Sequence, residues 1–121
     1  FAQEIESVFE NDKYIGYVLE NSENPEKGKY SLQVYDKNGA KKLECKLNMN
    51  YDSIQMWGKE IIAVRENECT ILNIKGNILF QGELEGDSIE TIVPAKGWRT
   101  YHVVFRDKIV KMQLQFWKNG K

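Results

Sequence analysis

The chain has few of the residues that build metal and redox sites. It contains two cysteines and one histidine among 121 residues. Cys45 and Cys69 form no Cys-x-x-Cys motif and no spacing typical of zinc ligands, and two cysteines do not make a disulfide framework. We therefore expect two reduced, buried thiols, with a disulfide as the alternative, and neither a bound metal nor a cofactor. His102 lies in an alternating strand pattern, which favours a structural or surface role over a Cys–His nucleophile pair.

Long apolar runs and an excess of charge of one sign are also missing. No stretch of ~18 apolar residues is present, which predicts no membrane insertion by this segment, and no signal peptide is recognisable. Lysine and glutamate are interspersed and the formal net charge is −1, so the composition argues against binding of nucleic acid or anionic lipid. Because the chain begins at Phe1 rather than at Met, we expect it to be a segment of a longer protein.

Short runs of aromatic and β-branched residues, which favour strands, alternate with polar turns. The first segment, Phe1–Phe9, is open to interpretation as a strand or a short helix. The other apolar runs predict antiparallel strands at Tyr14–Leu19, Tyr30–Tyr35, Lys41–Leu47, Ser53–Trp57, Glu60–Glu66, Cys69–Ile74, Asn77–Leu84, Thr91–Val93, Thr100–Phe105 and Lys108–Trp117. This order is that of a β-meander.

The meander is repeated. Asp52-Ser53-Ile54 recurs as Asp87-Ser88-Ile89, 35 residues later, at the same point of its unit. Gly39 and Gly76 occupy matching turns, each eight residues before a leucine. A period of ~35–46 residues with four antiparallel strands is typical of a propeller blade. We expect one all-β domain over residues 1–121, with about two and a half to three propeller-like units at 1–49, 50–86 and 87–121; the alternative is a β-sandwich or barrel.

Three local features carry further expectations. Asn38-Gly39 favours a hairpin turn of type I′, which needs positive φ at both residues. Gly16, inside a strand, is expected to admit a close neighbour. Because the last unit lacks a fourth strand, Phe1–Ile5 is expected to pair with the edge of Lys108–Trp117, within the chain or from a second copy, which would remove an exposed edge.

Two tryptophans are the candidate binding residues. Trp57 and Trp98 fall near the first-to-second-strand connections of successive units, so stacked units would bring both rings to the same face. Exposed aromatic residues often mark recognition surfaces, and these rings could also stack on sugars. The competing interpretation is that they fill gaps between blades. Trp117 is expected to pack on the terminal strand edge.

No catalytic motif stands out. Glu83, Glu85, Asp87 and Glu90 could form a carboxylate pair of the kind that glycosidases use, but they fall on predicted turns and outer faces. If they serve catalysis, they should converge on one pocket. We therefore expect no enzyme, and keep a fragment of a hydrolase or sugar-processing enzyme with a carboxylate site as the alternative.

The segments Tyr14-Ile15-Gly16-Tyr17-Val18 and Val34-Tyr35-Asp36-Lys37-Asn38-Gly39 are similar to repeats of WD40-like and quinoprotein-like propellers, without the signature Trp-Asp or cofactor residues of those proteins. The sequence, rich in Lys, Asn and Ile, also resembles an uncharacterised, membrane-anchored propeller-like family of Gram-positive clostridia. This resemblance implies an extracytoplasmic scaffold and carries over no functional residue. The function that we expect is a non-catalytic binding or scaffolding module presenting loops to a protein or glycan.

Overall fold

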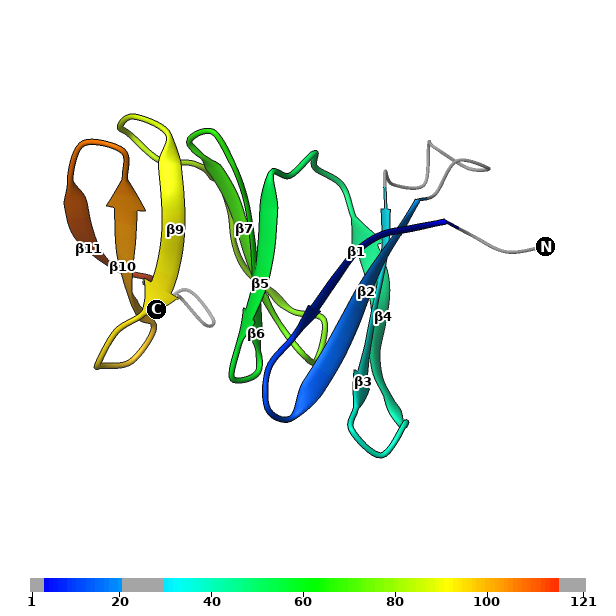
Figure 1. The fold of residues 1–121 in the computed structure, drawn as a ribbon. Coiled ribbons are helices and arrows are strands. Elements are labelled where there is room, and N and C mark those ends of the chain that lie inside the picture. Colours follow the sequence, from blue (N-terminus) through cyan, green and yellow to red (C-terminus); the bar gives the residue numbers. More distant parts are fainter. Residues whose placement is uncertain (1–3, 21–29, 116–121) are drawn as a thin grey trace.

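The computed structural model describes residues 4–20 and 30–115, and this part of the chain contains eleven β-strands and no helix (Figure 1). Residues 5–9 of the segment left open between strand and helix therefore belong to a strand, β1. The strands are β1 (Ile5–Glu10), β2 (Tyr14–Glu20), β3 (Tyr30–Asp36), β4 (Lys41–Leu47), β5 (Ser53–Trp57), β6 (Glu60–Arg65), β7 (Glu68–Asn73), β8 (Ile78–Glu83), β9 (Ile89–Pro94), β10 (Thr100–Phe105) and β11 (Ile109–Gln113).

The strands form three antiparallel sheets, which follow one another along the chain. Their orders are β1-β2-β3-β4, β5-β6-β7-β8 and β11-β10-β9, and we call them the first, second and third sheets. Figure 1 shows the sheets stacked face against face, with the second between the other two. None of them closes into a barrel over residues 4–20 and 30–115. The all-β prediction and the repeated meander are confirmed, and the closed-barrel alternative is wrong.

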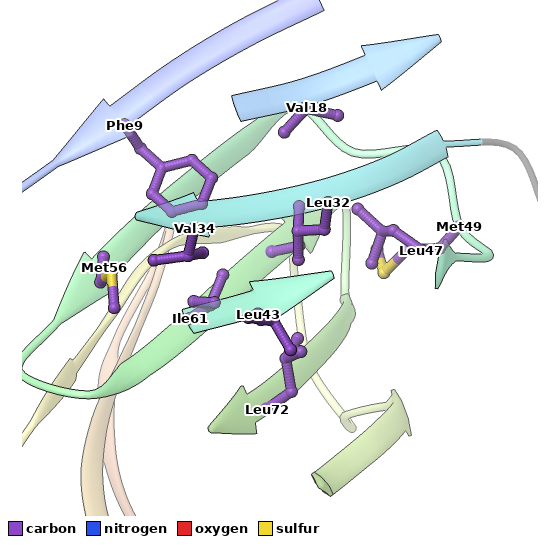
Figure 2. Close-up of a cluster of buried hydrophobic side chains, with 11 residues drawn as sticks. Phe9, Val18, Leu32, Val34, Leu43, Leu47, Met49, Met56, Ile61 and Leu72 are labelled. Atoms are coloured by element: carbon purple, nitrogen blue, oxygen red, sulfur yellow. The ribbon is translucent and has the colours of Figure 1, made fainter. Parts of the chain in front are cut away.

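Two apolar clusters hold the stack together. The first joins the inner face of the first sheet to the second sheet and includes Phe9, Val18, Leu32, Ile61 and Leu72 (Figure 2). The other joins the opposite face of the second sheet to the third sheet, and its buried members are Ile62, Val64, Cys69, Ile71, Ile89, Ile92, Tyr101, Val103, Phe105 and Leu114. The middle sheet is thus buried on both faces, because alternate side chains of a strand point to opposite faces.

The third-to-fourth-strand hairpins of the first two sheets have the same geometry. Asp36 Oδ1 accepts backbone N–H bonds from residues 38 and 40, and Asn73 Oδ1 accepts them from residues 75 and 77, at 2.9–3.0 Å. Gly39 and Gly76 have φ values of +91° and +89°. The expected type I′ turn is wrong, since Asn38 does not share the positive φ. A bulge after Val34 makes the loop longer than two residues, which favours a type I turn closed by glycine.

For the described residues, the predicted pairing of the N-terminal segment with the last strand is not found within the chain. Ile5 pairs with Leu19 in the first sheet, whereas β11 is an outer strand of the third sheet, at the opposite end of the stack (Figure 1). Ile5 therefore does not pair with β11. Residues 1–3 and Trp117 lie outside the described residues, and pairing from a second copy stays a prediction.

Candidate functional site

The turns that carry the two candidate tryptophans lie at the same end of their sheets. In Figure 1 the β1–β2, β5–β6 and β9–β10 turns all reach the lower end of their sheets. Trp57 is the last residue of β5, and Trp98 lies between β9 and β10. Both side chains are exposed, Trp57 at 37% and Trp98 at 61%. The two turns therefore lie at the same end of their sheets, whereas a shared face for the two rings and a binding role stay predictions.

Trp57 borders a hollow between the first strands of the first and second sheets. The volume of this hollow is about 560 Å³, and its lining residues are Val8, Phe9, Glu10, Asn11, Asp12, Ile54, Gln55, Met56, Trp57 and Gly58. The Asn11 side-chain amide donates a 3.0 Å hydrogen bond to the Gly58 carbonyl, which ties the β1–β2 turn to the β5–β6 turn. Gly58 has a φ of +59° and occupies the first central position of a two-residue turn, where a type II′ hairpin needs glycine.

Trp98 is held through its backbone. Its carbonyl accepts hydrogen bonds from the Thr100 hydroxyl and from the Gln113 side-chain amide, each 2.9 Å long. The Arg99 guanidinium carbon lies 5.4 Å from the centroid of the Trp98 ring, within the range of a cation–π contact. Arg99 itself has a φ of +52°, a left-handed conformation that is uncommon for residues other than glycine. The carbonyl that follows the ring is therefore held by two side chains, which fixes the local backbone.

A polar cluster joins the two tryptophan-bearing turns. The Tyr101 hydroxyl donates a 2.6 Å hydrogen bond to Glu60 Oε1, and Arg99 Nη1 lies 3.6 Å from Glu60 Oε2. Glu60 is paired with Trp57 across the β5–β6 hairpin, and Arg99 directly follows Trp98. Burial of Tyr101, and then its hydrogen bond to Glu60, raise the pKa of the phenol well above its ordinary value. The phenol thus stays a hydrogen-bond donor at neutral pH.

The remaining candidates for chemistry do not converge. Glu83, Glu85, Asp87 and Glu90 are all exposed, and Asp87 forms an ion pair of 3.4 Å with Arg106. His102, Cys45 and Cys69 occur on three different strands, β10, β4 and β7. Within the described part of the chain, no three His, Cys, Asp or Glu residues are grouped to hold a metal ion.

Both cysteines are free thiols, so the disulfide alternative is wrong. Cys69 is fully buried, whereas Cys45 is half-buried. The expectation of a buried thiol is therefore confirmed for Cys69 and only partly met for Cys45. Burial raises the pKa of Cys69 to about 12 and also raises the pKa of Cys45. Because the thiolate is the reactive form, neither thiol is activated at neutral pH. His102 is exposed on β10, as expected for a surface residue.

The Glu60–Arg99–Tyr101 cluster was not anticipated from the sequence. Glu60 and Tyr101 are 41 positions apart, and no motif connects them. One signal was available: Tyr101 lies in a strongly apolar strand, and a buried tyrosine hydroxyl usually finds a hydrogen-bond partner. Which partner it finds depends on how the second and third sheets stack.

The fold and the site define an all-β protein of stacked antiparallel meanders with exposed tryptophans at one end. The chain belongs to a family of unknown function, DUF5711, whose sequence profile matches residues 1–114. No curated protein matches the chain significantly. Over residues 4–20 and 30–115, the structure contains no helix long and apolar enough to cross a membrane.

Proposed function

We propose that the three sheets are blades of a propeller-like assembly and that this domain is a non-catalytic binding module. Its binding surface is formed by the turns at the lower end of the sheets in Figure 1, which carry Trp57 and Trp98. Its ligand is a glycan or a protein. The observation that carries this proposal is the pair of exposed indoles on adjacent sheets, joined through Glu60, Arg99 and Tyr101. Tryptophan is among the residue types most enriched at binding hot spots.

The repeat geometry supports the blade interpretation. The first strands of neighbouring sheets approach one another: the Thr91 hydroxyl on β9 donates a 3.2 Å hydrogen bond to Gln55 Oε1 on β5. Stacked four-stranded meanders of this period are the building unit of propellers. The third sheet has three strands in the described part of the chain, one fewer than each of the other two.

The rigidity of the site supports recognition over gap filling. A tryptophan that only filled a gap between sheets would be buried, whereas 61% of Trp98 is exposed. The two turns are also joined by the contacts of Glu60 with Arg99 and Tyr101, so the backbone that carries the rings needs little ordering when a ligand binds. The resemblance to membrane-anchored propeller-like proteins supports an extracytoplasmic location, which protease accessibility on intact cells would test.

The test is a binding screen with matched variants. The chain would be presented to an array of bacterial and host glycans and, in parallel, to labelled cell-surface proteins. We expect Trp57→Ala and Trp98→Ala each to weaken binding of a captured ligand by about 30-fold, which is the ~2 kcal/mol of a hot spot. The melting temperature should be nearly unchanged for Trp98→Ala, because 61% of Trp98 is exposed, and should fall only modestly for Trp57→Ala, because Trp57 is 37% exposed and borders the hollow.

The matched control is Ile109→Ala. This side chain is 67% exposed and begins β11. It lies beside the β10–β11 turn, at the upper end of the third sheet and away from the turns that carry the tryptophans (Figure 1). At chain concentrations low enough to keep every variant monomeric, it should bind as the unchanged chain does. A ligand whose affinity is the same for all three variants would show that the tryptophan end is not the binding surface.

A further inference from the structure

The first two sheets have equivalent positions that can be matched residue by residue. The identical hairpins place Asp36 with Asn73, so Tyr35 on β3 corresponds to Leu72 on β7. The strand register extends the match: Ile15 pairs with Tyr35, and Ile61 pairs with Leu72. Ile15 and Tyr17 on β2 therefore correspond to Ile61 and Ala63 on β6.

In the second sheet these positions receive a neighbouring sheet. Ile61, Ala63 and Leu72 are buried in the cluster that packs against the first sheet (Figure 2 shows Ile61 and Leu72). At the adjoining turn, a Cβ atom on Gly76 would lie 3.5 Å from the Leu43 side chain of the first sheet. This face of the second sheet is thus an acceptor face, which accommodates the sheet before it.

The equivalent face of the first sheet is hollow, and no other sheet of the described part of the chain covers it. A depression of about 620 Å³ is lined there by residues of β1, β2 and β3 and the turn that follows, among them Ile5, Ile15, Tyr17, Tyr35 and Gly39. A Cβ atom on Gly39, the counterpart of Gly76, would have nothing within 4 Å. The hollow therefore lies where the second sheet accommodates its neighbour.

The third sheet, which is the outer sheet opposite the first, carries the complementary face. The β10–β11 hairpin matches the β6–β7 hairpin, since Val104 pairs with Ile109 as Val64 pairs with Cys69. By the same match, four residues of the third sheet correspond to four of the second: His102 to Ile62, Val104 to Val64, Ile109 to Cys69 and Lys111 to Ile71. These four residues of the second sheet are the ones that it packs onto the third. On the third sheet the corresponding face is outward, and 67% of Ile109 is exposed.

We propose that this chain associates head to tail with a second copy: the outward face of one copy's third sheet packs into the hollow of the next copy's first sheet. Both halves of the contact are present on one chain, and each is equivalent to half of a contact already made between successive sheets. Because the two faces differ, the contact is heterologous, and such contacts build rings or open filaments rather than closed two-fold dimers.

Variants on the two faces separate this arrangement from any symmetric one. Ile109→Glu places a charge on the donor face, and Tyr17→Glu places one in the hollow. Either alone should weaken self-association at least tenfold in sedimentation and light scattering at up to roughly 1 mM chain. An equimolar mixture should form a heterodimer that grows no further, because one intact donor face meets one intact acceptor face.

Two controls keep the result interpretable. Ile5→Glu also lies in the hollow but alters a side chain that is 58% exposed, so it serves if Tyr17→Glu unfolds the sheet. Ile78→Glu alters an equally exposed isoleucine on β8 of the middle sheet and should associate normally. The proposal is overturned by a chain that stays monomeric throughout, by association that tolerates both face variants, or by a mixture that does not recombine. Loss of glycan or protein binding in the tryptophan variants would not bear on the proposed self-association.

Discussion

At the scale of single residues, the least space around any described glycine is at Gly16 on β2. It pairs with Phe9 of β1, and a Cβ atom at Gly16 would lie 2.2 Å from the Phe9 ring. The ring thus covers the glycine and closes the inner face of the first sheet, where Phe9 is buried. Glycine in a strand is normally unfavourable, and here its cost is offset by the aromatic ring that it admits.

Gly16→Ala should therefore destabilise the protein. The added methyl group forces the Phe9 ring out of its place in the core, and overpacking of this kind costs about 1–3 kcal/mol. Urea unfolding followed by tryptophan fluorescence would measure the loss. In a Phe9→Leu background the same substitution should cost much less, because the ring is gone. Equal costs in the two backgrounds would show that the methyl group meets no ring.

The close approach at Gly16 was predictable from the sequence, but the identity of the neighbour was not. A lone glycine in an apolar strand indicates close packing. Phe9 becomes the neighbour only through the register of β1 on β2, and that register shifts between Ile5 and Ser7. Such a bulge leaves no clear sequence signal.

At the scale of elements, the β6–β7 hairpin stores backbone strain in the centre of the fold. Its two turn residues are Glu66 and Asn67, and Glu66 has a φ of +55°. The Glu66 carbonyl accepts a 2.8 Å hydrogen bond from the Ile89 amide, and the Asn67 side chain donates to the Leu84 carbonyl. The turn is thus fixed by the connection that leads from the second sheet to the third.

Glu66→Gly should stabilise the protein. The left-handed conformation costs a residue other than glycine roughly 1–2 kcal/mol, and glycine avoids this cost. Glycine also makes the unfolded chain more flexible, which offsets about 0.5–1 kcal/mol of the gain. We expect a net gain of about 0.5–1 kcal/mol in the free energy of unfolding, measured by urea denaturation. Glu66→Ala should bring no such gain, because alanine keeps the Cβ atom. A gain of the same size with alanine would assign the effect to loss of the charge.

The strands themselves were largely predictable, and the turns less so. Polar residues flank each apolar run, so the existence of the strands follows from pattern alone. The type of turn at Asn38-Gly39 does not, because it depends on how many residues the loop contains, and the bulge after Val34 adds one. The repeat predicts that the turns carrying Trp57 and Trp98 lie at one end of their sheets, whereas the Glu60–Tyr101 contact depends on the packing of separate sheets.

For the whole molecule, burial is distributed unevenly along the stack. The second sheet is covered on both faces, so β6 and β7 carry unbroken runs of buried residues at 61–64 and 69–72. The end sheets are covered on one face, and β11 is mostly exposed. Sequence shows the run in β6 but not which neighbours cover it, since an apolar run reads the same whichever sheet lies on each side.

This distribution predicts a gradient of local stability. Backbone amides of β6 and β7 should exchange with solvent by global unfolding, whereas those of β11 should exchange through local opening, because few buried contacts are lost when an edge strand separates. Hydrogen exchange followed by mass spectrometry at low chain concentration should show protection at least ~10-fold greater in β6 and β7 than in β11. If copies associate end to end, raising the concentration should slow exchange in β2 and β10 and leave β6 unchanged, and Ile109→Glu should abolish that slowing. Uniform exchange across the three sheets would mean that the stack opens as one unit and that its ends are no weaker than its centre.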